Sequence, residues 1–207
     1  MRTAGLFVVL GIFCGSAWAQ MPRNRVDVYY AFTDFEIDEI DLDMDGDTVG
    51  VRVRGGDQLG FLTFELQGGD LDTRINSVKF RNSVQNYRGG VGLRALRSRN
   101  ADLWGRLEYT RLDTDLNAGG FNFIDDREEG YGVHLGAQLG GAEFNVVAEA
   151  GYLAYTNLAG GEYSVCLNWQ PRGIGLFVES RYTDLEFDDF DADQEILDLR
   201  VGVRFQF

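Results

Sequence analysis

Apolar residues recur at every second position along most of the chain, and this alternation constrains the fold more than any other feature. The C-terminal segment 197–207 (LDLRVGVRFQF) shows it clearly, because leucine, valine and phenylalanine alternate with charged or small residues up to Phe207. Successive side chains of a β-strand point to opposite faces, so such a strand has one apolar face and one polar face. No apolar stripe with helical spacing is sustained over three turns.

Ten segments share this alternation, and each is close to the roughly 9 to 11 residues that a tilted strand needs to cross a bilayer. They are residues 26–32, 48–55, 61–67, 87–95, 102–110, 131–139, 144–155, 162–169, 173–183 and 197–207. Tyr30, Tyr109, Tyr152 and Tyr182 lie near the strand ends, as in an interfacial aromatic belt. Every strand in lipid must pair on both sides, which requires closure. The sequence therefore predicts an all-β chain, a transmembrane antiparallel up-and-down β-barrel of ten strands, with eight as the alternative.

The connections between these segments alternate in length. The short ones are 55–60, 97–101, 140–143 and 170–173. The others are mostly longer, polar and acidic, and 68–86 and 113–129 are the longest. Tight turns at one end and long loops at the other are typical of outer-membrane barrels, whereas a soluble sandwich does not require this segregation. An even strand number also predicts that both termini lie at the tight-turn, periplasmic end.

The first residues have the pattern of a secretory signal peptide. Arg2 is positively charged, residues 4–15 are apolar, and Ala17-Trp18-Ala19 places small residues where signal peptidase needs them. The apolar run is shorter than the roughly 20 residues of a membrane-spanning helix. We therefore predict a signal peptide at residues 1–19 and a barrel domain at residues 20–207.

Composition restricts the partners and the covalent chemistry. The chain has 33 Asp and Glu against 19 Lys and Arg, a formal net charge of −14, which argues against nucleic acid as a partner. Removal of Cys14 with the signal peptide leaves Cys166 alone, so no intramolecular disulfide can form. Other interactions must hold the fold together.

The polar faces of the predicted strands carry acids and arginines in similar numbers, and Lys79 is the only lysine. The planar arginine fork pairs bidentately with carboxylates, and an unpaired charge inside a barrel is costly unless water reaches it. We therefore predict a lumen ion-pair network. Its members are Arg52, Glu65, Arg88, Arg94, Arg106, Glu108, Glu149, Glu179, Arg181, Asp198, Arg200 and Arg204. A structural plug and a selective pore lining both remain open, because a ten-stranded lumen lies between filled small barrels and wide porins.

The signal peptide, the alternating strands and the aromatic C-terminus together resemble the small outer-membrane β-barrel proteins of Gram-negative bacteria, the group of OmpA-like and opacity-type barrels. The resemblance covers the whole mature chain and rests on architecture. It implies a bacterial outer-membrane location, a monomer, and contact with outer-membrane lipid and lipopolysaccharide. In that group a final Phe is read by the barrel-assembly machinery, which implies that Phe207 is an assembly signal and that periplasmic chaperones are earlier partners.

The resemblance implies a structural or narrow-pore role with acidic extracellular loops. Surface recognition through those loops is the alternative, and a lipid-modifying enzyme is a further one. Enzymatic barrels use a histidine near the loop end or on the lipid-facing surface, whereas we place His134, the only histidine, inside. The deacylase His-x-Ser pattern needs serine where Gly136 stands, and the Asp-His pairing of omptin-type proteases does not surround His134. We therefore expect no catalytic residues.

Two acidic segments carry further predictions. Residues 41–47 (DLDMDGD) match the opening of a calcium-binding loop, but its twelfth position is Arg52 instead of glutamate. We predict at most a weak Ca²⁺ site at Asp41, Asp43 and Asp45, and no other cofactor. Residues 33–43 and 183–193 also match each other in pattern, which indicates a duplicated hairpin. Because the first and last strands of a closed barrel are neighbours, we expect these two segments to emerge as neighbouring loops.

Overall fold

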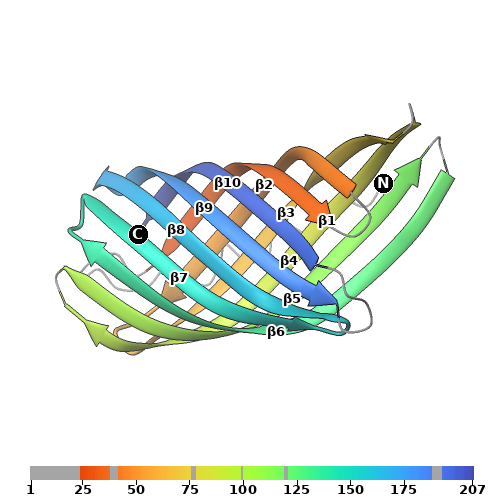
Figure 1. Cartoon of the computed structure of the whole chain (residues 1–207). Helices are drawn as coiled ribbons and strands as arrows, with labels where there is room; N and C mark the ends of the chain where they lie inside the picture. Colours follow the sequence, from red (N-terminus) through yellow and green to blue (C-terminus); the bar gives the residue numbers. More distant parts are fainter. Residues whose placement is uncertain (1–23, 38–41, 76–77, 99, 119–120, 188–192) are drawn as a thin grey trace, which may run out of the picture.

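Ten antiparallel strands form a closed barrel in the computed structural model (Figure 1). The structure describes residues 24–37, 42–75, 78–98, 100–118, 121–187 and 193–207, so the predicted signal peptide lies outside the described residues. The strands are β1 (Arg25–Ile37), β2 (Leu42–Gly56), β3 (Gly60–Ile75), β4 (Val78–Arg97), β5 (Ala101–Ala118), β6 (Phe121–Gly140), β7 (Phe144–Tyr155), β8 (Leu158–Arg172), β9 (Ile174–Phe187) and β10 (Asp193–Gln206). The predicted ten strands are confirmed, and the eight-stranded alternative is excluded.

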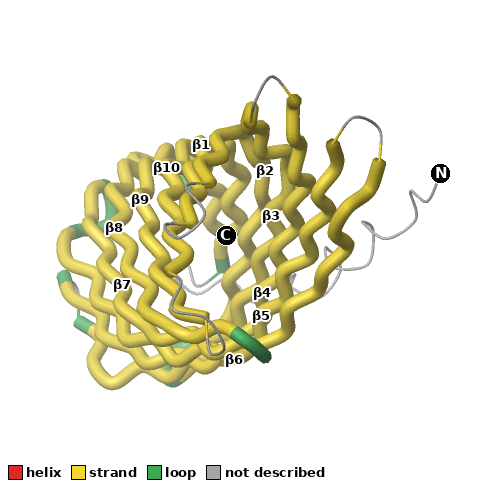
Figure 2. The backbone as a smooth tube through the Cα atoms, turned by 45° about the vertical axis from the view of Figure 1, so that its right-hand side comes forward, coloured by secondary structure: helices red, strands yellow, loops and turns green. Residues whose placement is uncertain are grey.

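Each strand pairs with its sequence neighbours, and the pairing of β1 with β10 closes the ring. This seam runs from Arg25 opposite Gln206 to Ile37 opposite Gln194, and the Phe207 N–H extends it by donating to the Asn24 carbonyl at 3.1 Å. The wall consists of strands throughout, with its described loops at the strand ends (Figure 2). Both ends of the described chain therefore lie at the tight-turn end of the barrel.

The tight turns occur where the sequence predicts them. The chain reverses between β2 and β3, β4 and β5, β6 and β7, and β8 and β9 within a few residues. Gly140 and Gly173 have positive φ angles of 118° and 30°, a backbone region that favours glycine because it has no Cβ. These two glycines allow the chain to turn sharply at the ends of β6 and β8.

The prediction of long loops at 68–86 and 113–129 is wrong. Strands β3 and β4 continue through the first segment to Ile75 and from Val78, and β5 and β6 pair through most of the second. These strands project beyond the rest of the barrel, most clearly for β5 and β6 at the right of Figure 1. We call this projecting part, residues 68–75, 78–86, 111–118 and 121–129, the strand extension.

The alternation reverses in the part of the wall that lies toward the extended end. In the middle of the barrel the outer face is apolar and the inner face is charged. Toward the extended end the inner face is apolar instead, and its buried residues include Met44 and Leu71, each 1% exposed. The outer face of the extension carries ion pairs such as Arg81 with Asp72 at 3.3 Å. Polar residues face outward because this part of the wall meets water. An outward apolar face, which we used to recognise strands, is therefore missing there.

Aromatic rings inside the barrel pack on glycines of the next strand. Each ring belongs to the residue directly opposite its glycine in the ladder, and a Cβ on the glycine would lie within 2.7 Å of the ring. The pairs are Tyr29 on Gly50, Phe61 on Gly92, Trp104 on Gly136, His134 on Gly151 and Phe177 on Gly202. These glycines let large rings lie flat against the inner wall and leave room for the charged side chains.

We expect Gly136→Ala to destabilise the barrel, because its methyl group would meet the Trp104 ring at 2.3 Å. Overpacking of this kind costs about 1 to 3 kcal/mol. Gly105→Ala on the outer face is the matched control, since its Cβ meets no atom closer than 3.8 Å. Urea unfolding from lipid vesicles, followed by tryptophan fluorescence, measures both changes. Equal stability of the two variants would show that the Trp104 ring moves aside without cost.

Candidate functional site

All twelve predicted lumen residues lie on the inner face of the barrel. Ten of them are buried, and Arg94 and Glu149 are partly buried, with side chains 9% and 14% exposed. In each strand the inward position follows from the alternation, since the residues before and after it point outward. The strand pairing then decides which of these charges meet.

Five residues form a central ion-pair cluster: Arg52, Glu65, Glu179, Arg181 and Arg200. The Arg52 Nη2 atom lies 2.8 Å from Glu179 Oε2, and Glu65 Oε1 accepts hydrogen bonds from Arg181 Nη1 at 3.1 Å and Arg200 Nη1 at 2.9 Å. These contacts join β2 to β9 and β3 to β9 and β10. They therefore cross the lumen between strands that are not neighbours.

Other ion pairs connect more distant walls. Arg54 on β2 donates from Nη2 to Glu149 Oε1 on β7 at 3.2 Å, and these strands are five positions apart in the ring of ten. The Arg54 guanidinium also lies over the Phe61 and Trp104 rings, 4.3 and 5.2 Å from their centroids. Such stacking adds a cation–π attraction to the ion pair. Arginine thus connects opposite walls and packs on the aromatic layer at once.

The His134 cluster (Arg88, Glu108, His134 and Glu162) lies in the same interior. His134 Nε2 is 2.9 Å from Glu108 Oε1, and Arg88 contacts Glu108 at 3.3 Å and Glu162 at 2.6 Å. Ligand atoms of Glu108, His134 and Glu162 lie within 4.8 Å of one another, a spacing that could hold a metal ion. Arg88 pairs with both carboxylates, and Arg106 pairs with Glu108 at 2.9 Å, so two guanidinium charges already offset the two carboxylates. This arrangement suits an ion-pair cluster better than a cation site.

Sequence reasoning missed several members of the lumen. Glu162, Gln67 and Asn168 are buried on the inner face, and Gln67 and Asn168 accept hydrogen bonds from Arg200 and Arg204. Glu162 shares its parity with the inward Cys166 and Asn168, so the alternation of its strand could have identified it. Gln67 and Asn168 were not predicted because they carry no charge, although their amide oxygens accept hydrogen bonds from the arginines.

Side chains fill the lumen around these clusters. Two cavities inside the barrel measure about 20 Å³ and about 90 Å³, and the larger one lies at the turn end. A buried water needs roughly 10 to 15 Å³ by this measure. The two cavities therefore have room for one or two waters and for several waters, respectively.

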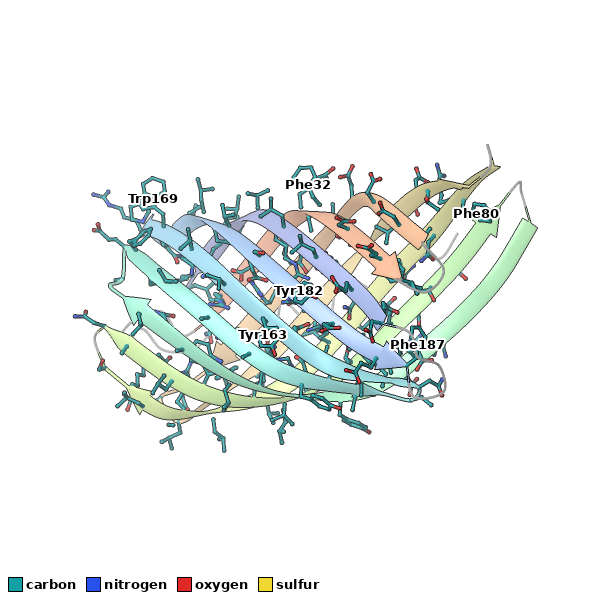
Figure 3. All side chains as sticks on the ribbon, in the orientation of Figure 1. Phe32, Phe80, Tyr163, Trp169, Tyr182 and Phe187 are labelled. Atoms are coloured by element: carbon teal, nitrogen blue, oxygen red, sulfur yellow. The ribbon has the colours of Figure 1, made fainter. Side chains whose placement is uncertain are left out.

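The outer face of the wall is a broad apolar belt. Its residues include Val28, Leu62 and Leu107, which are 47%, 59% and 59% exposed. Trp169 lies at the turn end of this belt, and Phe32 lies on the outer face closer to the extended end (Figure 3). An apolar surface of this extent is rare on soluble monomers, and it matches the lipid-facing band of a membrane barrel.

The predicted aromatic positions lie on this outer face. Tyr30, Tyr109 and Tyr152 are exposed, and Tyr182 is partly exposed. In addition, Tyr109 packs edge-on against Tyr131 of the next strand, with ring centroids 5.8 Å apart. Amphipathic rings at such positions suit the boundary between lipid and water.

The predicted calcium loop has a different conformation. Asp41 lies outside the described residues, whereas Asp43 and Asp45 belong to β2 and are exposed on the outer face. The expectation of a loop is therefore wrong for residues 42–47. Gly46 allows β2 to approach β3 closely, because a Cβ at this position would lie 2.2 Å from the Asp70 carbonyl oxygen.

The two similar acidic segments are also strands in their described parts. Residues 33–37 of β1 pair with residues 194–198 of β10, which places Glu36 opposite Glu195. The segments are neighbours as expected, but their acidic residues project from paired strands. Ladder pairing continues past the membrane boundary and leaves fewer residues for loops.

Comparisons with known proteins show the fold. No family model matches the sequence, and no curated protein matches it. The outer membrane protease OmpT from Escherichia coli superimposes with a TM-score of 0.57 at 9% identity, covering 89% of this chain and 96% of that chain. The transport unit of the Escherichia coli autotransporter AIDA-I gives 0.52 at 10% identity, covering 95% and 94%. Ail of Yersinia pestis gives 0.45 at 12% identity, covering 90% and 100%.

The chain is an outer-membrane β-barrel by architecture. The fold class and the outer-membrane location predicted from the sequence are confirmed by this architecture and the lipid-facing belt. Identity near one residue in ten establishes the fold alone, so the protease and autotransporter names say nothing about the activity of this barrel.

We expect Glu65→Gln to destabilise the barrel strongly, because Glu65 accepts hydrogen bonds from Arg181, Arg200 and the Tyr29 hydroxyl group. Removal of one partner from a buried ion pair costs about 3 to 5 kcal/mol. The matched control is Asp72→Asn in the exposed Arg81–Asp72 pair, where the cost should stay below about 1 kcal/mol. Urea unfolding from lipid vesicles measures both. Similar losses in the two variants would contradict the special role of the buried charge.

Proposed function

We propose that this protein is a structural outer-membrane barrel whose lumen is closed by cross-wall ion pairs, so that it does not act as an open pore. The observation that carries the proposal is the connection of non-neighbouring strands across the lumen, Arg54 to Glu149 and Arg52 to Glu179, through side chains at most 14% exposed. A permeating solute would have to displace these pairs. That is costly because each separated charge would remain buried.

The lumen supports a mechanical role for the same reason. Every pair between distant strands restrains the barrel cross-section, and the aromatic rings that pack on glycines occupy further interior space. A rigid barrel of this kind anchors the strand extension at the membrane surface. The proposal includes no catalytic step, since His134 is buried and hydrogen-bonded to Glu108.

Planar-bilayer recording tests the closed lumen. We expect no regular conductance steps from the wild-type barrel. The double variant Arg52→Ser with Glu179→Ser removes a matched ion pair from the lumen and should introduce conductance steps. The control is Arg81→Ser with Asp72→Ser on the outer face of the extension, which should behave as the wild type. Regular conductance steps from the wild-type barrel would contradict the proposal.

Surface recognition is a second candidate, and the strand extension favours it. Its outer face carries ordered ion pairs, Arg81 with Asp72 and Arg111 with Asp113, the latter at 2.5 Å. Paired strands present these charges on a rigid platform, which reduces the ordering cost of binding. A barrel shortened by both projecting hairpins should fold but lose binding to a surface partner. Retained binding would count against recognition by this platform.

The proposed partners are outer-membrane lipid with lipopolysaccharide, periplasmic chaperones and the barrel-assembly machinery, acting on a monomer. Phe207 lies at the end of the closing seam and is 58% exposed, so its ring is accessible to such a machinery. Its backbone N–H holds the seam whatever the side chain is. A role of the ring in assembly is therefore separable from its role in closure.

We expect Phe207→Asp to reduce assembly in cells much more than it reduces refolding into detergent micelles. The assembly machinery would read the aromatic ring, whereas micelles require only a closed apolar belt. Phe144→Asp is the matched control, because Phe144 is also an exposed aromatic residue at the turn end, 56% exposed. It should affect both settings to a similar degree. An equal response of the two variants would mean that Phe207 contributes only packing.

A further inference from the structure

The larger lumen cavity, of about 90 Å³ at the turn end, has an excess of positive charge. Five arginines line it: Arg25, Arg54, Arg94, Arg97 and Arg204. Asp102 is the carboxylate among the described lining residues, and it pairs with Arg94 at 3.1 Å. The turn residues Ser98, Gly141 and Ala142 complete the rim, which places the cavity at the end that would face the periplasm.

The carboxylates near this cavity are shared among several arginines. Asp27 lies 2.6 Å from Arg204, 3.1 Å from Arg52 and 3.7 Å from Arg25. Glu149 likewise serves both Arg54 and Arg106, at 3.2 and 3.0 Å. Arg52 and Arg106 have further acids in Glu179 and Glu108. Asp27 and Glu149 are therefore two carboxylates that face three arginines of the cavity lining, Arg25, Arg54 and Arg204.

Strand pairing also brings two of the positive charges close together. Arg25 and Arg54 stand directly opposite each other on β1 and β2, and like charges in that position repel. Arg54 is 8% exposed, and its Nε is a buried donor with no hydrogen-bond partner. The Nε of Arg25 is also buried without a hydrogen-bond partner. Unsatisfied buried donors are rare in folded proteins, and an ordered water or a bound ion is one explanation for such a group.

We propose that this cavity binds a small oxyanion of the phosphate type. Several acceptor oxygens on one anion match the planar donor forks of neighbouring arginines, and the negative charge offsets the repulsion between Arg25 and Arg54. The volume holds several water-sized atoms, which suits an oxyanion of this size. The site is independent of whether the barrel conducts.

Titration calorimetry on the full barrel, refolded in an uncharged detergent, tests the proposal with inorganic phosphate and, separately, glycerol phosphate. Chloride at matched ionic strength gives the baseline. We expect saturable binding of inorganic phosphate. Equal binding of both probes would assign the site to a terminal phosphate group such as a lipid headgroup carries, and binding of inorganic phosphate alone would assign it to the free ion.

Two variants make the test specific. Arg25→Gln should weaken phosphate binding about tenfold, as expected for the loss of one charge-assisted contact. In chloride its melting temperature should be at least that of the wild type, because the Arg25–Arg54 repulsion is gone. Arg172→Gln is the control, since Arg172 is exposed at the same end and does not line the cavity. It should bind phosphate as the wild type does.

If Arg25→Gln does not refold, Arg97→Gln replaces it as a second lining variant nearer the rim. Identical effects of phosphate and chloride on the wild type would overturn the proposal. Equal weakening by the lining variant and by Arg172→Gln would also overturn it, because general attraction to the arginines at the turn end would then explain the binding.

Discussion

Arginine–carboxylate pairs that reach across the lumen are the interaction on which the rest of this barrel depends. Closure of ten strands satisfies the backbone in lipid but creates an interior that must be filled. Arg54 with Glu149 and Arg88 with Glu162 connect strands four or five positions apart in the ring. Because each charge is buried, its partners must be placed accurately, and this requirement defines one arrangement of the walls.

The surroundings of the wall change along its length, and the residue pattern changes with them. Within the lipid belt the outer face is apolar and the lumen is ionic, whereas toward the extended end Met44, Leu71 and Leu153 are buried on the inside. The same ladder continues through both regions. Lipid outside and ion pairs inside thus give way to water outside and apolar packing inside, without a break in backbone pairing.

The alternation in the sequence predicted the inward charges and ten strands, with eight as the alternative. The lengths of the connections predicted the tight turns, and the need for backbone pairing in lipid predicted closure. The alternation could not predict where the strands end. The ends of β3 and β4 lie in water and carry outward polar residues such as Asp70 and Arg81, so the outward apolar face that marks a strand in lipid is missing there. The alternation also could not say which charges meet. Arg54 contacts Glu149 only because the register of every strand between them brings the two side chains together. Gly46 allows close strand pairing, although its position in the sequence suggested a calcium loop.

A double-mutant cycle on Arg88 and Glu162 tests the central claim most directly. These residues contact each other at 2.6 and 2.7 Å from β4 and β8. With Arg88→Met and Glu162→Gln, urea unfolding from lipid vesicles should give a coupling free energy of at least about 1.5 kcal/mol, as for close charge pairs elsewhere. A coupling below about 0.5 kcal/mol, with additive effects of the two substitutions, would contradict the account.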